Sequence, residues 1–177
     1  MIHFHTIHDV EDQSWPLFLD VYTASFPIDE QRPTDDIARL LTDEPRFCAM
    51  ALLDGKERFV GFLTSWKFDA FIYVEHFALA VALRSQGYGS MALQTFIAKV
   101  SPCPIVLEVE PPTDTLARRR VGFYERCGLA LYDYDYIQPS YTPDRMALPL
   151  RLMGTLPTGT DLHEVAEKLH REVYGIK

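Results

Sequence analysis

Cysteine, long apolar runs and signal-like segments are scarce in this sequence. Its three cysteines lack Cys-x-x-Cys spacing, which argues against a disulfide framework or a zinc site. The unbroken apolar run at residues 77–83 is far too short to span a bilayer. The first residues also lack the basic and long apolar segments of a secretory signal. We therefore expect a cytoplasmic protein with no membrane partner.

Positive charge is also in the minority. The formal net charge of −8 disfavours binding to nucleic-acid phosphates, so we expect no nucleic-acid partner. The same charge favours encounter with cationic small molecules.

What is present fits a globular protein, with 47% hydrophobic and 24% charged residues. A length of 177 residues predicts one domain over residues 1–177. Helix starts are expected near Ser14, Thr34, Ser90, Asp114 and Asp161. Strands are predicted at residues 2–7, 47–53, 59–68, 71–81, 105–110, 129–137 and 145–153.

The segment Arg84-Ser85-Gln86-Gly87-Tyr88-Gly89-Ser90 follows a predicted strand and opens a predicted helix. Glycine lets the backbone approach a ligand closely, and the first amides of a helix have no internal partner. Amides and helix dipole can therefore converge on an anion, which indicates a cofactor that carries a pyrophosphate.

The same turn also satisfies a degenerate dinucleotide fingerprint. Glu108 and Glu110 fall near the position of its ribose-binding acid, about 20 residues on. However, this turn is mid-chain and is followed by only about one strand–helix unit, whereas a doubly wound dehydrogenase needs several. The order of elements therefore disfavours a dinucleotide-binding protein.

The pattern Arg84-x-x-Gly87-x-Gly89 after a strand resembles the signature of the GNAT superfamily of acyl-coenzyme A-dependent N-acyltransferases. A second stretch, from Val121 through Phe123-Tyr124 to Gly128-Leu129, resembles the Phe-Tyr-x-x-x-Gly-Phe motif of that family. The resemblance covers most of the chain. It implies a mixed α/β fold with a central mixed, mostly antiparallel sheet of about six or seven strands flanked by helices.

The resemblance has two departures. The family often has Asn shortly before its Phe-Tyr pair, but here the stretch is Ala117-Arg118-Arg119-Arg120. Leu129 also stands where Phe is commoner, an exchange of one apolar residue for another.

The resemblance implies acetyl-coenzyme A as co-substrate and no metal. The amides of the glycine turn would bind the pyrophosphate, and the strand backbone near Ala78 and Leu79 would pair with the pantetheine arm. The cofactor-binding residues are then Ala78, Leu79, Arg84, Gln86, Gly87, Tyr88, Gly89, Ser90 and Tyr124.

Two residues are the catalytic candidates. In the family motif Tyr124 would protonate the departing thiolate, although a tyrosine on an amphipathic helix also packs in cores. Strand alternation predicts that Tyr73, Glu75, Phe77 and Leu79 share one face, which would bring Glu75 near the acyl group as base. Glu108 and Glu110 are alternative bases, and His76 is expected on the opposite face as a packed residue.

The acceptor site is expected to use the segment after the first helix. Residues 26–33 resemble a segment of bacterial GNAT members, so Phe26, Glu30 and Arg32 would line the acceptor site, together with Tyr73 and Glu108. Glu30 and Arg32 could equally tie the loop down by ion pairing. Tyr132, Tyr134 and Tyr136 would form an aromatic face for an amine, for a dimer partner or for the core.

The implied activity is direct transfer of an acetyl group to a primary amine of a small molecule or peptide in a ternary complex. A second hypothesis is a regulatory module that binds coenzyme A without catalysis. We also expect a homodimer, because symmetric dimers are the commonest assembly.

Overall fold

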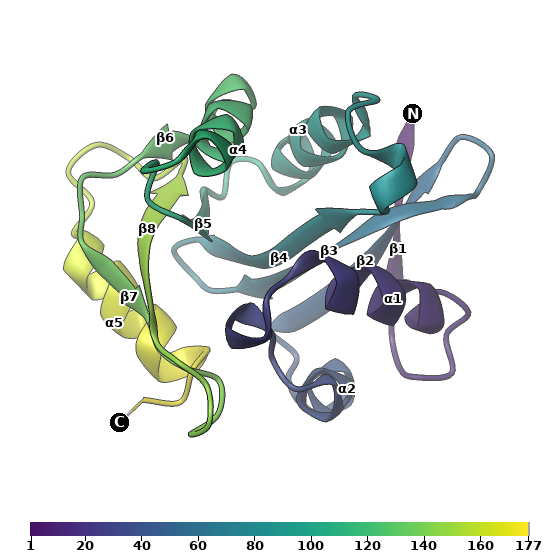
Figure 1. Ribbon diagram of the computed structural model, residues 1–177, viewed down its shortest axis with the longest axis horizontal. Coiled ribbons are helices and arrows are strands. Elements are labelled where there is room, and N and C mark those ends of the chain that lie inside the picture. The colour runs from purple at the N-terminus through teal and green to yellow at the C-terminus, as the bar shows by residue number, and fades with distance from the viewer. Residues whose placement is uncertain (177) are drawn as a thin grey trace.

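The computed structural model describes residues 1–176, which form an eight-stranded sheet in the order β1-β2-β3-β4-β5-β8-β6, with β7 also paired to β8 (Figure 1). The β4–β5 pair is parallel and the other pairs are antiparallel. The predicted mixed, mostly antiparallel sheet is therefore confirmed. The strands are β1 (Ile2–Ile7), β2 (Phe47–Asp54), β3 (Phe59–Lys67), β4 (Ile72–Leu79), β5 (Ile105–Val109), β6 (Ala130–Leu131), β7 (Tyr136–Gln138) and β8 (Leu148–Gly154).

Helices cover both faces of the sheet, with α3 and α4 on one face and α1 and α2 on the other (Figure 1). The sequence forms them at the expected capping signals: Asp114 and Asp161 accept hydrogen bonds from the first amides of α4 and α5. The helices are α1 (Trp15–Ser25), α2 (Thr34–Asp43), α3 (Tyr88–Val100), α4 (Thr115–Arg126) and α5 (Leu162–Glu172), with short 3₁₀ turns η1 (Ile28–Glu30) and η2 (Val81–Leu83).

The apolar core is divided by the sheet. On one side, Phe18 and Tyr22 of α1 and Leu169 of α5 pack with sheet residues such as Phe62. On the other side, the side chains of α3 and α4 pack with sheet residues that include Leu63, Val74, Leu107 and Met153. Because both faces are covered, the central strands are buried on both sides, as their nearly continuous apolar runs require.

β4 and β5 are paired over only part of their length. Ile72, Tyr73 and Val74 pair with Ile105, Val106 and Leu107, and within residues 1–176 the rest of β4 has no partner in β5. The free edge of β4 therefore runs on to Leu79 beside an opening in the middle of the sheet.

A bulge interrupts β4 at Glu75. Val74 pairs with Ser65 and His76 pairs with Thr64, which leaves Glu75 as the extra residue. Glu75 and His76 consequently both contact the α1 side of the sheet, where Trp66 and Phe26 lie, whereas Phe77 packs on the α3 side. The predicted shared face of Glu75, Phe77 and Leu79, and the opposite face for His76, are therefore wrong.

The predicted strand at residues 129–137 is two short strands, β6 and β7, with an irregular link between them. The tyrosines of this segment do not form one strand face. The Tyr132 hydroxyl accepts a hydrogen bond from the Leu156 amide, Tyr134 contacts His163 on α5, and Tyr136 is buried. The predicted strand face is therefore wrong, but all three side chains belong to one core, in which Tyr136 is buried and against which Tyr132 and Tyr134 pack.

Candidate active site

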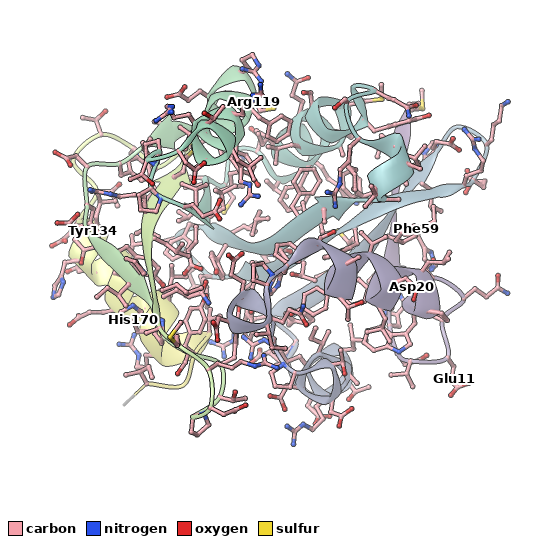
Figure 2. All side chains as sticks on the ribbon, viewed as in Figure 1. Glu11, Asp20, Phe59, Arg119, Tyr134 and His170 are labelled. Atoms are coloured by element: carbon pink, nitrogen blue, oxygen red, sulfur yellow. The ribbon has the colours of Figure 1, made fainter. Side chains whose placement is uncertain are left out.

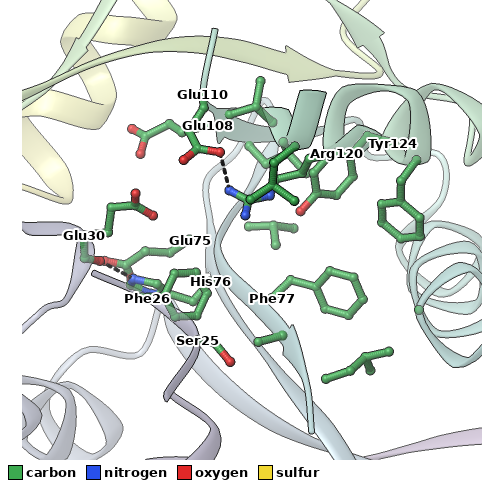
Figure 3. Close-up of a pocket in the computed structure, with 18 of the residues that line it drawn as sticks. Ser25, Phe26, Glu30, Glu75, His76, Phe77, Glu108, Glu110, Arg120 and Tyr124 are labelled. Carbon is green, nitrogen blue, oxygen red and sulfur yellow. Dashed lines mark hydrogen bonds and ion pairs between the residues drawn. The ribbon is translucent and has the colours of Figure 1, made fainter. Parts of the chain in front are cut away.

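A cleft of about 720 Å³ opens where β4 and β5 part. Its walls come from the end of α1, the η1 turn, the free edge of β4, β5, and the facing parts of α3 and α4. In Figure 3, Glu30, Glu75 and Glu108 lie on one side of the cleft, with Phe77 and Tyr124 on the other. The cleft thus joins the glycine turn to a group of carboxylates.

The glycine turn presents a run of unpaired amides. Within the part of the chain that the structure describes, the backbone N–H groups of residues 85–90 donate no hydrogen bond. Ser85 has a φ of 63° and Gly87 a φ of 84°, so the turn curls before α3 begins at Tyr88. Converging amides at a helix N-terminus form an anion site, and the residues present therefore fit a pyrophosphate.

Arg84 bridges the mouth of this cleft. Its Nε donates to the Leu79 carbonyl at 3.2 Å and its Nη2 donates to the Ser25 hydroxyl at 2.9 Å. Both Arg84 and Ser25 line the cleft. Gln86 turns back to the Ala82 carbonyl through its side-chain amide. The cofactor roles predicted for Arg84, Gln86, Ala78 and Leu79 stay predictions.

Tyr124 lies on α4 with its ring against Phe123, at 5.1 Å between centroids, and it lines the cleft. Burial raises the pKa of Tyr124 to about 12, so the phenol is protonated at neutral pH. The phenol makes no hydrogen bond to any other residue in 1–176. Tyr124 therefore packs in the core with a protonated hydroxyl, and its catalytic role stays a prediction.

Glu75 is buried in an ion pair. Its Oε1 accepts hydrogen bonds from Arg32 at 2.8 and 3.1 Å and from the Tyr141 hydroxyl at 2.8 Å, and its Oε2 accepts one from Trp66 at 2.8 Å. Burial alone would raise the pKa of Glu75, but the charge of Arg32 and these bonds lower it below its ordinary value. A carboxylate held in this way is a weak proton acceptor.

Arg32 ties the loop after α1 to the sheet and to the end of α5. Besides Glu75, its Nη2 contacts the Val173 carbonyl at 3.0 Å, and its guanidinium lies over the Trp66 and Tyr141 rings. Of the two predicted arrangements for Arg32, the described contacts are those of the ion pair that fastens the loop. A lining role for Arg32 in the acceptor site is not supported.

Phe26 and Glu30 do line the cleft. Glu30 forms no ion pair with another residue in 1–176, and burial together with the nearby charge of Glu110 raises its pKa. Its carbonyl is 2.9 Å from His76 Nε2, and the Phe26 ring packs against the His76 ring. His76 is thus a packed residue, as expected.

Glu108 of β5 also lines the cleft, and Tyr174 contacts both of its carboxylate oxygens, at 3.1 and 2.9 Å. Burial raises the pKa of Glu108 to about 7, although the nearby hydroxyls of Tyr136, Tyr174 and Tyr73 oppose the rise. Tyr73 itself is fully buried and contacts Tyr174, so it does not line the acceptor site as predicted. A carboxyl with a pKa near neutrality is well suited to proton transfer.

Sequence reasoning missed Tyr141 and Tyr174. Neither belongs to a motif, and each reaches a glutamate that is distant in the chain. Their aromatic type was the only available signal.

Residues 1–176 contain no helix with the length and apolar character needed to cross a bilayer. They also contain no group of three or more His, Cys, Asp or Glu side chains arranged to hold a metal ion.

Comparison with known proteins identifies the family. The sequence profile described as the acetyltransferase (GNAT) family matches residues 7–129. The chain belongs to the GNAT acetyltransferase family. A GNAT-family protein from Bacteroides thetaiotaomicron is 36% identical, with a TM-score of 0.92 and 99% of each chain covered. None of the curated proteins compared with this acetyltransferase matches it significantly.

More distant structures share the GNAT fold. A Bacillus subtilis acetyltransferase in complex with CoA has a TM-score of 0.58 at 12% identity, covering 89% of this chain and 99% of its own. A spermidine N-acetyltransferase from Vibrio cholerae in complex with CoA and spermine has a TM-score of 0.63 at 12% identity, covering 88% and 95%. The GNAT prediction is confirmed, and the dinucleotide-binding alternative is excluded.

Proposed function

We propose that this GNAT acetyltransferase moves an acetyl group from acetyl-coenzyme A to a primary amine of a small molecule or peptide within a ternary complex. The observation that supports this most directly is that one end of the cleft is suited to an anion and the other end is suited to a cation. One end has unpaired amides at residues 85–90 with Arg84, and the other has Glu30 and Glu108, neither of which forms an ion pair within residues 1–176. An anionic cofactor and a cationic acceptor would each meet complementary charge.

In the proposed reaction, Glu108 first accepts a proton from the charged acceptor, which frees the lone pair of its nitrogen. The nitrogen then attacks the thioester carbonyl, so that a C–N bond forms and the C–S bond breaks. Tyr124 donates a proton to the departing sulfur and regains one when the new amide nitrogen loses its second proton. Exchange with solvent then removes the proton from Glu108. Holding both substrates in one cleft supplies the favourable orientation.

Glu108 is a better base than the predicted Glu75. Glu75 is bonded through both oxygens and paired with Arg32, so protonating it would cost the energy of a buried ion pair. Glu108 has no ion pair within residues 1–176, lines the cleft, and has a pKa of about 7. Glu110 is less suitable because it is paired with Arg120 at 2.6 Å.

The test is thiol release from acetyl-coenzyme A by the full chain with a panel of polyamines, aminoglycosides, amino acids and peptides. Active enzyme with at least one amine is expected, and Glu108→Gln should reduce the rate at least about 10²-fold. Glu125→Gln, an exposed change on α4, is the matched control and should keep the rate. Tight coenzyme binding without thiol release for any amine would instead favour the regulatory-module hypothesis.

A further inference from the structure

The chain that follows α5 contacts Glu108, which lines the cleft. The Tyr174 hydroxyl contacts the two carboxylate oxygens of Glu108 at 3.1 and 2.9 Å, and it is 3.0 Å from the Tyr73 hydroxyl. Tyr174 has one hydroxyl proton to donate. When that proton is given to a charged Glu108, Tyr73 must be the donor in the contact between the two tyrosines.

The Arg32–Glu75 ion pair contacts the residues that flank Tyr174 in the sequence and in space. Arg32 donates to the carbonyl of Val173, the residue immediately before Tyr174, at 3.0 Å. Val173 itself is buried in the core. The Tyr174 ring also lies against Tyr141, at 5.1 Å between centroids, and Tyr141 donates to Glu75. The buried ion pair therefore fixes the peptide that carries Tyr174.

We infer that Tyr174 is a positioning residue for acetyl transfer: it aligns the Glu108 carboxylate toward the acceptor amine, and the Arg32–Glu75 pair fixes it in place. This inference rests on the proposed function, in which Glu108 is the base. A carboxyl group turns easily about its terminal bond, and a hydroxyl that contacts both oxygens restricts that rotation. Tyr174, two residues beyond the end of α5, thereby becomes part of the proposed active site.

Tyr174 also affects how readily Glu108 ionises. The groups that face Glu108 are Tyr73 and Glu75 on β4, Tyr136 on β7 and Tyr174, while its partner residue on β8 is the apolar Leu152. Burial and the Glu75 charge raise the pKa of Glu108, and the tyrosine hydroxyls lower it by stabilising the carboxylate. Loss of the Tyr174 hydroxyl should therefore raise this pKa further.

The test compares kcat/KM against pH for the wild type, Tyr174→Phe and Tyr134→Phe. Tyr134 lies on the outer side of the molecule near α5 (Figure 2), where its hydroxyl contacts His163, so Tyr134→Phe is a matched control. In Tyr174→Phe the acid limb of the profile should move up by about one pH unit, so that the loss is roughly tenfold larger below the limb than above it. The KM for acetyl-coenzyme A should not change. An acid limb that stays at the wild-type pH, with or without a loss of rate, would overturn the inference.

A second measurement separates this inference from the proposed function. The Glu108 carboxyl is titrated by NMR in side-chain-labelled enzyme without substrates, with Glu108→Gln used to assign its signal. If Tyr174→Phe raises the Glu108 pKa and Tyr134→Phe does not, Tyr174 controls this carboxyl even in a protein that shows no turnover. An unchanged Glu108 pKa in Tyr174→Phe refutes the inference. Full activity in Glu108→Gln refutes the choice of base and with it the role of Tyr174 in acetyl transfer, whereas the control of the Glu108 pKa by Tyr174 is judged by the titration alone.

Discussion

At the scale of single residues, two glutamates of the site differ in how readily they accept a proton, because their neighbours differ. Glu75 is paired and bonded through both oxygens, whereas Glu108 is bounded by tyrosines and has a pKa of about 7. Both are glutamates on neighbouring strands, so residue type alone could not rank them. Their partners, Arg32 and Tyr174, come from distant parts of the sequence, and those partners decide which carboxylate can accept a proton.

Tyr124 is predicted to act as the acid that protonates the leaving thiolate. Tyr124→Phe keeps the ring and its packing against Phe123, but it removes the only proton that this side chain can donate. Turnover should fall at least about 10²-fold while coenzyme A binding, measured by calorimetry, stays within about twofold. Unchanged turnover in Tyr124→Phe would leave this residue with a packing role only.

Glu30 is predicted to attract the charged acceptor. Glu30→Gln removes a carboxylate that forms no ion pair within residues 1–176, so KM for a cationic amine should rise by about threefold to tenfold, or about 1 kcal/mol. The effect should shrink in high salt because the charges are then screened. Glu11→Gln, which changes the net charge equally but far from the cleft (Figure 2), is the control and should leave KM unaltered. A rise of the same size in Glu11→Gln would indicate a general charge effect.

At the scale of secondary-structure elements, the sequence predicts a feature correctly when neighbouring residues alone determine it. The start of α3 and the turn before it could be read from Gly87, Gly89 and the apolar spacing that follows. The β4 bulge could not, because it arises from how Ser65 and Thr64 pair with β4. Strand alternation assumes no bulge, and for that reason it assigned Glu75 to the wrong neighbours.

The irregular segment between β6 and β7 also arises from contacts with residues that are distant in the sequence. The alternating tyrosines have the residue types of a strand, but Tyr132 and Tyr134 use their hydroxyls to bind Leu156 and His163 instead of forming a common face. Contacts with distant residues thus override local propensity. The proposed role of Tyr174 could not be predicted for the same reason, because it depends on the path of the chain after α5.

The turn before α3 provides a prediction at this scale. Gly87 has a φ of 84°, and a side chain in this left-handed conformation costs about 1–2 kcal/mol. Gly87→Ala should therefore lower thermal stability, coenzyme A affinity, or both, by a combined amount of that size. Gly55→Ala, in the β2–β3 turn with open space around its added methyl group, should change neither property. Equal behaviour of the two variants would contradict a strained anion-binding turn.

At the scale of the whole molecule, the cleft joins parts that are far apart in the chain. The Arg32–Glu75 pair links the loop after α1, the β4 bulge and the segment after α5, and that segment reaches Glu108 on β5. Stability and activity are consequently coupled. A base with a raised pKa must be kept in surroundings that disfavour its charge, which costs folding free energy whenever the base is ionised.

This coupling predicts how stability depends on pH. The pKa of Glu108 rises from 4.5 to about 7 on folding, so its contribution is fully present below about pH 4.5 and is lost as pH increases through about 7. Glu108→Gln stays uncharged, so its melting temperature should exceed that of the wild type at pH 8 and match it near pH 4.5. Glu125→Gln should show no such difference in thermal denaturation. A Glu108→Gln variant that is less stable than the wild type at pH 8 would mean that the Tyr174 contact stabilises the ionised carboxylate by more than burial disfavours it.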